Sequence, residues 1–373
     1  MKSLHKNKDE KDSLVVVHYQ KIMDDLFKRP AQWLSGTGQH ADIVISSRIR
    51  LARNLYDLPY TARAKDYELT EIMHKVRSAL MSVSSWSDMS FFEITKLSDL
   101  DKQFFIERRL LSPYMLKSKG PGGLTVMRDQ QSSVIINEED HLRIQVIHSG
   151  LEIKNAWQAI SKLDDELGEH LEYQFSDQFG YLTACPTNTG TGMRVSIFIH
   201  LPGLALAGSV EKVMKDLAPG EVTIRGFYGE GTDVLGNFFQ ISNQLTLGRA
   251  EDGIIQRMEL VAERLIEMET EARKELLEKN RLLLEDRVYR AFGLLLYSRM
   301  INSIEIIALL SDIRLGVESG FFTEIERKDI NEAMVLSQPA HLQKYYKKVL
   351  TSSQRDMLRA ELIRKKLNLT IVN

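Results

Sequence analysis

The stretch "VIINEEDHLRIQVI", residues 134–147, places a compact acidic turn between two runs of β-forming residues. The residues on both sides are mostly valine and isoleucine, which favour strands. Three acidic residues stand at 138–140, and Arg143 follows closely. The pattern predicts two strands joined by a polar turn. A local ion pair between Glu139 and Arg143 is the simpler interpretation of the charges when the turn is considered alone.

Strand-like and helix-like segments are mixed in the sequence around this turn. The β-like runs lie at 122–129, 132–137, 142–150, 195–201 and 221–229, and the stretch 41–55 begins as a strand. The helical patterns, in which apolar residues recur every three or four positions, lie at 66–86, 154–171 and 208–217. Because strands and helices do not alternate strictly, we predict an α+β fold rather than a doubly wound one.

The chain changes character near residue 249, after which nearly all of the sequence has a helical pattern. An apolar stripe from Ile254 to Met268 forms one helical face, which we expect to contribute to self-association. We predict a domain boundary near 255. The predicted organisation is an N-terminal tail and short helix at 1–40, a sheet-containing domain at 41–255 and a helical domain at 256–373.

Composition narrows the class of protein. Of the 373 residues, 27% are charged and 43% hydrophobic, which is ordinary for a soluble globular protein. The net charge of −2 gives no bulk electrostatic reason to bind nucleic acid or a membrane. One cysteine, Cys185, excludes a disulfide within the chain. The N-terminus has too short an apolar run for a signal peptide, so we expect a cytoplasmic protein.

Several segments carry arginines in positions that suit an anion. In "SSRIRLARN", residues 46–54, Arg48 and Arg50 are two positions apart and share one face of a strand. Paired guanidinium groups are unfavourable unless an anion lies between them, and the arginine fork suits phosphate. The other segments are "CPTNTGTGMRVSIFIHL" at 185–201, with Arg194, and "IRGFYGEGTD" at 224–233, with Arg225 and Glu230. Each segment alone is also compatible with a solvated strand edge or an ordinary turn.

The common nucleotide and metal motifs do not explain these segments. No G-x-x-x-x-G-K-[ST] phosphate loop and no H-E-x-x-H zinc motif occurs. "GTGQHA" at 36–41 fits a dinucleotide pattern only loosely, because it precedes a strand instead of opening a helix. The nine histidines form no obvious ligand set. We therefore predict no metal site built from protein side chains.

Taken together, "SSRIRLARN", "NEEDHLR", "CPTNTGTGMR" and "RGFYGE…FQISN" resemble the successive signatures of the ATP:guanidino phosphotransferases, the phosphagen kinases. They occur in family order between residues 46 and 243. The resemblance implies a catalytic domain at 41–255 built on an antiparallel sheet flanked by helices, similar to that of glutamine synthetase. It also implies ATP, with Mg²⁺ held mainly through the nucleotide phosphates.

The resemblance implies individual roles as well. Glu139 and Glu230 match the two carboxylates that hold the acceptor guanidinium, and Cys185 matches the reactive cysteine of the family. Arg109 stands where a related segment has histidine. The ATP-binding positions that carry over are Ser46, Ser47, Arg48, Ile49, Arg50, Arg109, Arg143, Arg194, Val195, Ser196, Ile197, Phe198, Arg225, Gly226, Phe227, Tyr228 and Gly229.

Two departures, a short segment before the first motif and a long helical region after "FQISN", are similar to one subfamily, the bacterial protein arginine kinases. Only 45 residues precede Ser46, too few for the helical domain that precedes the first motif in kinases of free arginine or creatine. "RDMLRA" at 355–360 matches a phosphoarginine-binding motif, R-D-x-x-R-A. The implied binding residues are Arg355, Asp356, Arg359 and Ala360. Without the family context, a solvated helical charge cluster is the alternative.

We therefore predict an ATP-dependent protein arginine kinase. The alternatives are a kinase of free arginine or another small guanidino compound, and a non-catalytic phosphoarginine-binding adaptor. The resemblance implies protein substrates that present arginine, a homodimer, a zinc-containing activator protein and the Clp protease system as partners. It also implies allosteric regulation and a role in protein quality control and the stress response.

Overall fold

The structure, a computed structural model, describes residues 19–217, 220–226 and 235–369. Its centre is an eight-stranded sheet in the order β2-β3-β4-β5-β1-β8-β10-β9, and its neighbouring strands pair antiparallel. The strands of this sheet are β1 (Val44–Arg53), β2 (Met89–Glu93), β3 (Gly123–Met127), β4 (Ser132–Ile136), β5 (Leu142–Ser149), β8 (Met193–His200), β9 (Val222–Arg225) and β10 (Phe238–Asn243). The predicted α+β class is confirmed.

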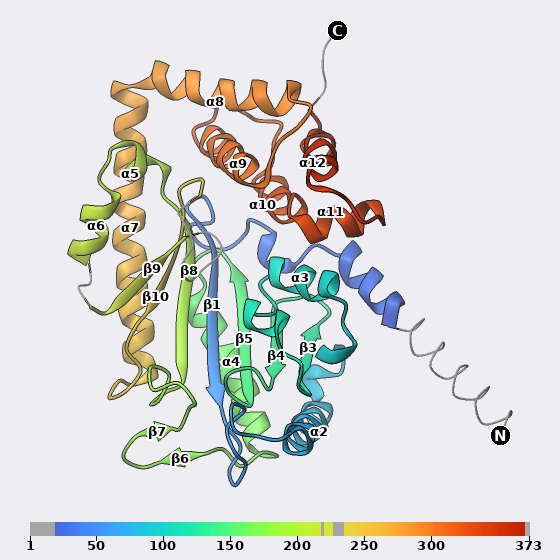
Figure 1. Ribbon diagram of the computed structural model, residues 1–373. Coiled ribbons are helices and arrows are strands. Elements are labelled where there is room, and N and C mark those ends of the chain that lie inside the picture. Colours follow the sequence, from blue (N-terminus) through green and yellow to red (C-terminus); the bar gives the residue numbers. More distant parts are fainter. Residues whose placement is uncertain (1–18, 218–219, 227–234, 370–373) are drawn as a thin grey trace, which may run out of the picture.

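Helices surround this sheet, and a two-stranded sheet of β6 (Phe175–Ser176) and β7 (Gly180–Tyr181) lies beside it (Figure 1). Residues 19–28 are helical. The helices that follow are α2 (Asp66–Ser82), α3 (Asp99–Glu107), α4 (Ile153–Gly168), α5 (Pro202–Leu206), α6 (Val210–Leu217), α7 (Glu251–Lys279), α8 (Arg281–Tyr297), α9 (Ser303–Glu318), α10 (Arg327–Leu336), α11 (Pro339–Tyr346) and α12 (Ser352–Lys366). Short 3₁₀ turns are η1 (Gln32–Leu34), η2 (Ser84–Trp86), η3 (Ile94–Lys96) and η4 (Pro113–Leu116).

The acidic stretch at 138–140 lies in the hairpin between β4 and β5. Ile136 pairs with Leu142, and residues 137–141 make the turn. Asn137 adopts a positive φ of 59°, which asparagine tolerates better than most residues. Its side-chain amide donates to the Leu69 carbonyl at 2.7 Å. Asparagine therefore permits the turn and also ties it to α2.

Alternation of side chains along the strands gives the sheet two unlike faces. One face is apolar, and Ile49, Val195 and Ile197 on it are buried in a core completed by α2, α4 and α7. Figure 1 shows α4 and α7 running along the strands. The apolar patterns predicted at 66–86 and 154–171 are thus the buried sides of α2 and α4.

The apolar stripe of α7 belongs to the same core. Ile254, Met258 and Leu265 are buried against the sheet, so the stripe is not exposed to mediate self-association, contrary to expectation. Leu276 and Leu277 at the far end of α7 pack in a second core instead. The part of α7 beyond residue 255, where the domain boundary was predicted, therefore contributes to both cores.

The second core joins the C-terminal helices to one end of the polar face of the sheet. Ile147 and Phe198 from the strands are buried there with Leu310 and Ile313 of α9. In Figure 1, α8 to α12 gather at the end of the sheet where β1 begins. A third core, in which Phe104 and Phe105 of α3 pack with Leu124 and Ile135, covers the same face over β3 and β4. The part of the face over β5, β1, β8 and β10 is left for the functional site.

Candidate active site

Strand register brings the predicted phosphate-binding arginines onto the polar face. Arg50 of β1 lies opposite Arg194 of β8. Arg143 of β5 lies opposite Ala52 of β1. Since side chains two positions apart share a face, Arg143 lies on the same side as Arg48 and Arg50. Three adjacent strands thus contribute guanidinium groups to one surface.

The same face continues across β10 to β9. Gln240 of β10 lies opposite Phe198 of β8 on one side and opposite Arg225 of β9 on the other. Residues directly opposite in an antiparallel sheet point to the same side. The five predicted arginines that lie on strands therefore come together from segments that are far apart in the sequence.

These arginines are close enough to repel one another. The pKa of Arg48 is lowered to about 9, first by burial of the side chain and then by four surrounding arginines, of which Arg109 has the largest effect. Burial and neighbouring arginines likewise hold the pKa of Arg50 well below its usual value. A polyanion would relieve this repulsion, so the electrostatics of the face favour a ligand with several negative charges.

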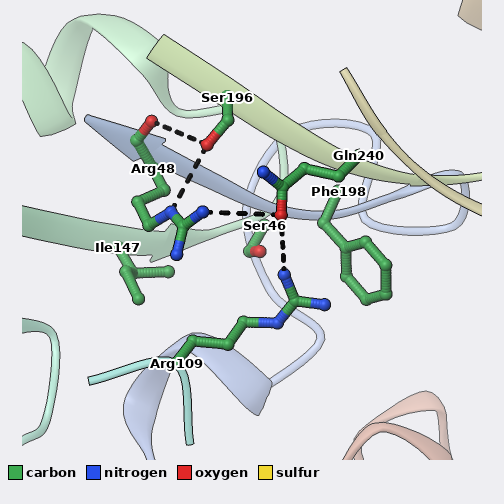
Figure 2. A pocket seen from close by; sticks show the side chains of 7 residues that line it. All are labelled: Ser46, Arg48, Arg109, Ile147, Ser196, Phe198 and Gln240. Carbon is green, nitrogen blue, oxygen red and sulfur yellow. Dashed lines mark hydrogen bonds between the residues drawn. The ribbon is translucent and has the colours of Figure 1, made fainter. Parts of the chain in front are cut away.

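A small pocket lies on this face next to the C-terminal helices (Figure 2). Its lining residues are Ser46, Arg48, Arg109, Ile147, Ser196, Phe198 and Gln240. Gln240 Oε1 accepts from Arg48 at 3.4 Å and from Arg109 at 3.2 Å. The Arg109 guanidinium lies over the Phe198 ring, with Cζ 4.0 Å from the ring centroid. The pocket therefore combines cations with a flat aromatic surface, beside the larger arginine cluster.

Four other predicted ATP contacts have side chains on the opposite face. Ile49, Val195 and Ile197 are buried in the apolar core. Ser47 donates there to the Gly150 carbonyl at 2.8 Å. Side-chain contact between these four residues and a ligand on the arginine face is excluded by the alternation of the strand.

The last predicted segment is described only at its start. Gly226 is buried and directly follows β9. Phe227, Tyr228, Gly229 and Glu230 lie outside the described residues.

The acidic residues of the β4–β5 turn occupy different environments. The Glu138 side chain is 3% exposed and lies 2.5 Å from Arg143, whereas Glu139 is 43% exposed and lies 3.5 Å from Arg143. Burial raises the pKa of Glu139, while Arg143 and a hydrogen bond with Cys185 oppose the rise. Glu139 and Cys185, both predicted to act on the acceptor, are therefore adjacent.

Asp140 is the structural member of the acidic turn. Its Oδ1 accepts from the Asn54 side-chain amide and from the Ala184 backbone N–H, each at 2.7 Å. Asn54 directly follows β1, and Ala184 directly precedes Cys185. Asp140 thus ties the acidic turn to the end of β1 and to the loop that carries the cysteine.

The cysteine loop is held against the chain that follows β10. Thr246 Oγ1 donates to the carbonyls of Thr187 at 2.9 Å and Thr189 at 2.7 Å. Gly190 has a φ of +113°, and a Cβ there would come within 2.6 Å of the Thr246 carbonyl oxygen. Glycine is required for this approach. The loop therefore presents Cys185, whose Sγ lies 3.0 Å from Thr187 Oγ1, in a fixed position.

Four residues of this site were not predicted from the sequence: Glu138, Asp140, Gln240 and Ser242. The sequence shows three adjacent carboxylates. Nothing in it distinguishes Glu138, which pairs with Arg143, from Asp140, which anchors the turn. Gln240 and Ser242 were detectable, since period-two alternation through "FQISN" puts both on one face. Ser242 Oγ accepts from Arg194 at 3.1 Å.

The R-D-x-x-R-A residues lie on α12, in the helical domain. Arg359 is 1% exposed, and it donates to the carbonyls of Ser337 at 2.8 Å and Ile301 at 2.7 Å. It also pairs with Asp356 at 2.6 Å. Ala360 is buried. These contacts are those of a packed structural arginine, and a solvated charge cluster does not describe them.

Arg355 of the same motif is partly exposed and donates to the Leu350 carbonyl at 2.8 Å. The Asp356 side chain is also partly exposed. Of the four motif residues, these two present polar atoms at the surface of α12.

The described residues contain neither a cluster of metal ligands nor a membrane-spanning helix. No group of three or more His, Cys, Asp or Glu side chains in the described part of the chain could hold a metal ion. Within the same ranges, no helix is both long and apolar enough to cross a bilayer.

Comparisons with known proteins agree with this geometry. Residues 71–272 match the family described as "ATP:guanido phosphotransferase, C-terminal catalytic domain", and residues 281–371 match "Protein-arginine kinase McsB C-terminal domain". The protein-arginine kinase of Symbiobacterium thermophilum is 43% identical over 91% of this chain and 97% of its own length. That of Halothermothrix orenii is 41% identical over 93% of this chain and 99% of its own length.

Solved structures confirm the fold. A lombricine kinase aligns with a TM-score of 0.57 and 24% identity, over 68% of this chain and 73% of its own. The duplicated taurocyamine kinase of Schistosoma mansoni aligns with a TM-score of 0.57 and 23% identity, over 66% of this chain and 35% of its own. The chain therefore belongs to the ATP:guanido phosphotransferases and, within them, to the protein-arginine kinase family.

Proposed function

We propose that the chain transfers the γ-phosphoryl group of ATP to arginine side chains of proteins. Membership of the protein-arginine kinase family supports the acceptor. The observation that carries the reaction type is the joining of five arginines, on one sheet face, with the adjacent pair of Glu139 and Cys185. A polyanion and a cationic nucleophile would meet where these two groups of residues meet.

The polarity of the face supports one orientation of ATP. The pocket of Phe198 and Arg109 lies at the start of β1 and takes the nucleoside end. Arg48, Arg50 and Arg194 take the phosphates. Arg143, which pairs with both Glu138 and Glu139, takes the terminal phosphate next to the acceptor. Mg²⁺, bound by the phosphates themselves, would supply further neutralisation of charge.

The chemical step needs a base because the acceptor is protonated. An arginine guanidinium stays protonated throughout the physiological pH range and is therefore a poor nucleophile. Glu139 orients the reacting nitrogen and takes its proton while the N–P bond forms and the bond from the γ-phosphorus to the ADP oxygen breaks. The raised pKa of Glu139 suits it to accept that proton. The cluster arginines stabilise the charge that accumulates on the departing ADP.

Cys185 and Glu230 complete the proposed acceptor site. Cys185 hydrogen-bonds Glu139 and restrains its carboxylate. Glu230, which lies outside the described residues, is the second carboxylate of the clamp. With two carboxylates on a planar guanidinium, the reacting nitrogen is held in line with the phosphorus.

We propose a second binding site on α12 for phosphoarginine. Arg355 and Asp356 present polar atoms that can meet the phosphoryl group and the guanidinium, while Arg359 and Ala360 support the helix from within. We also propose a homodimer formed through the helical domain. Leu282 and Leu283, exposed on α8, supply an apolar surface for that contact.

The remaining proposals rest on the family resemblance. They are a zinc-containing activator protein, cooperation with the Clp protease system, allosteric regulation, and a role in protein quality control during stress. A cytoplasmic location is proposed with them, since a single cysteine suits a reducing compartment.

The test is mass spectrometry of an arginine-rich model protein incubated with the enzyme and Mg-ATP and handled without acid. Acid-labile phosphate on arginine side chains is the expected result, and it should be absent with Glu139→Gln. Phosphorylation of free arginine alone would identify a small-molecule kinase. If phosphoarginine is bound but no transfer to either acceptor occurs, the chain is an adaptor and the proposal fails.

A further inference from the structure

Arg109 reaches the pocket from an unusual backbone position. It follows the C-terminal end of α3 with a φ of +62°, a conformation that favours glycine. The turn is a Schellman motif, in which the N–H of Leu110 donates to the Phe105 carbonyl at 2.9 Å and the N–H of Arg109 to the Ile106 carbonyl at 2.8 Å. An arginine in this place is strained, so neighbouring contacts must fix the turn.

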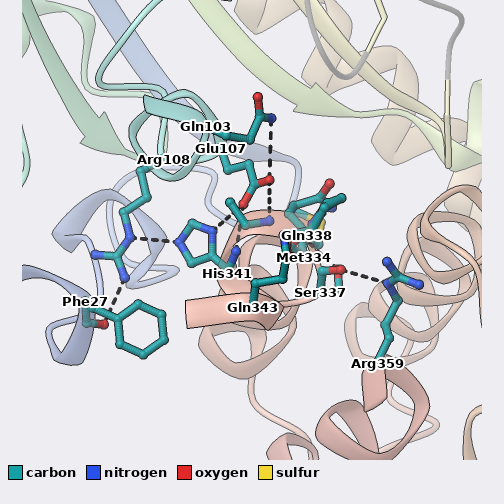
Figure 3. A network of polar contacts seen from close by, with 12 residues as sticks. Phe27, Gln103, Glu107, Arg108, Met334, Ser337, Gln338, His341, Gln343 and Arg359 are labelled. Atoms are coloured by element: carbon teal, nitrogen blue, oxygen red, sulfur yellow. Dashed lines mark hydrogen bonds and ion pairs between the residues drawn. The ribbon is translucent and has the colours of Figure 1, made fainter. Parts of the chain in front are cut away.

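Glu107, two residues earlier, holds the start of α11 (Figure 3). Its side chain is 3% exposed. The carboxylate accepts from the backbone N–H of Ala340 at 2.9 Å, from that of His341 at 3.0 Å, and from His341 Nδ1 at 2.7 Å. These are the orphan donors of a helix N-terminus, where a negative charge is most favourable.

Arg108 closes the network on the other side of the His341 ring. Its Nε donates to His341 Nε2 at 3.0 Å. Its Nη1 donates to the carbonyls of Leu26 and Arg29, each at 2.8 Å. Burial lowers the pKa of His341 to about 4, so the ring is neutral and can accept from Arg108. Arg108 is thereby fixed from three directions, immediately before Arg109.

We propose that Glu107 and His341 are positioning residues for nucleotide binding, because they hold the strained turn that places Arg109 in the pocket with Arg48 and Gln240. This inference rests on the proposed function, since it takes the pocket to bind ATP. It adds that the helical domain completes that pocket through α11, although it supplies none of the lining residues.

The contact continues into the helical domain. Arg359 donates to the carbonyl of Ser337, which lies in the turn between α10 and α11 (Figure 3). The network from α12 to the pocket thus runs through the start of α11 and the end of α3. Its members come from segments more than 230 residues apart in the chain, as the separation of Glu107 and His341 shows.

The test is a double-mutant cycle on ATP affinity, measured by calorimetric titration of Mg-ATP into the full chain. Arg109→Ala should weaken binding roughly tenfold, because a charge-assisted contact is lost. Glu107→Ala should weaken it severalfold in the wild-type background. In the Arg109→Ala background, Glu107→Ala should change affinity less than about twofold, which is the scatter of independent sites. Steady-state kinetics should show a higher KM for ATP with kcat at saturating ATP retained.

Lys344→Met is the matched control. Lys344 also joins α11 to α3, through Asp101 at 2.5 Å, but at the opposite end of α3 from Arg109. This variant should lower the melting temperature and leave ATP affinity unchanged. Should Glu107→Ala fail to fold, Glu107→Gln, which keeps the size of the side chain and one oxygen acceptor, takes its place in the cycle.

The outcomes separate this inference from the proposed function. If Glu107 variants bind ATP as the wild type does, or weaken binding equally with and without Arg109, the positioning role is refuted while the kinase assignment stands. If the wild-type chain itself does not bind Mg-ATP, the proposed function fails first.

Discussion

Two sets of arginines in this molecule make opposite use of the same side chain. On the sheet face, Arg48 is held by two long contacts of 3.4 Å, and neighbouring arginines help to lower its pKa to about 9. Between the sheet and the helical domain, Arg314 is fully buried and donates to the Asn331 side chain at 2.7 Å and to the Ala41 carbonyl at 2.5 Å. Burial lowers the pKa of Arg314 to about 9 as well, but the largest charge that acts on it is that of Glu318, whereas the charges that act on Arg48 are those of other arginines.

The difference shows that burial of an arginine does not by itself identify a binding site. A structural arginine is recognised by short bonds to carbonyls and carboxylates, as for Arg314 and Arg359. The proposed anion-binding arginines Arg48 and Arg50 instead have other arginines as their main charged neighbours, and Arg143 combines such neighbours with its ion pair to Glu138. By this criterion Arg359 belongs to the structural set, although its sequence motif suggested a ligand contact.

The largest expected effect is a loss of turnover on substitution of a residue in the proposed active site. Glu139→Gln should lower kcat about 10²–10⁴-fold, because the proton acceptor is lost. Stability should hardly change, since Glu139 is nearly half exposed and its ion pair with Arg143 is long, at 3.5 Å. Steady-state kinetics and chemical denaturation measure the two quantities. Turnover close to that of the wild type would remove Glu139 from the catalytic account.

Substitution of a structural arginine should have the opposite result, a loss of stability without a loss of ATP affinity. Arg314→Met should lower the free energy of unfolding by about 3 kcal/mol, since the buried acceptors of Asn331 and Ala41 lose their donor. Mg-ATP affinity of the folded fraction should be unchanged. Chemical denaturation checks the first quantity and calorimetry the second. A stable variant with impaired ATP binding would break the distinction between the two sets.

A pH dependence should mark the structural network as well. The pKa of His341 falls from 6.5 to about 4 on folding, because the ring is buried. The unfolded chain therefore binds this proton more readily, and stability should fall as the pH decreases from 6.5 towards 4. The contribution of His341 is at most about 3 kcal/mol. Denaturation at pH 7 and pH 4.5 should give a smaller difference for His341→Gln than for the wild type; equal differences would contradict this assignment.

The smallest effect is expected at the cysteine. Cys185→Ser should lower kcat less than about tenfold, because a hydroxyl can replace the thiol in the hydrogen bonds to Glu139 and Thr187. A thiolate essential to the chemistry would instead make this variant inactive. The same rapid assay as for Glu139→Gln decides between the two.

Much of this arrangement could be predicted from local sequence. Valine and isoleucine on both sides of the acidic turn predicted the β4–β5 hairpin, and period-two spacing predicted that Arg48 and Arg50 share a face. The alignment of Arg50 with Arg194 could not be obtained in this way. It depends on the register between β1 and β8, which shifts at an irregularity between Val44 and Ser46 and is set by the packing of the sheet.

The contacts around α3 could not be predicted from local sequence patterns. Strands β2 and β10 and helix α3, which is only nine residues long, were not predicted from the sequence. The contact of Glu107 with His341 joins residues 234 positions apart. Equally, the stripe from Ile254 to Met268 was correctly interpreted as an apolar helical face but not assigned to the sheet as its partner. Periodicity identifies a buried face without identifying what covers it.

The most direct test of the central claim, that the sheet face is the ATP phosphate site, is calorimetric titration of Mg-ATP into Arg194→Ala. The account predicts binding at least about tenfold weaker than in the wild type, because a charge-assisted contact of roughly 1.5–3 kcal/mol is removed. The melting temperature should be unchanged or higher, since the substitution also relieves repulsion among the arginines. Unchanged affinity for Mg-ATP would contradict the account.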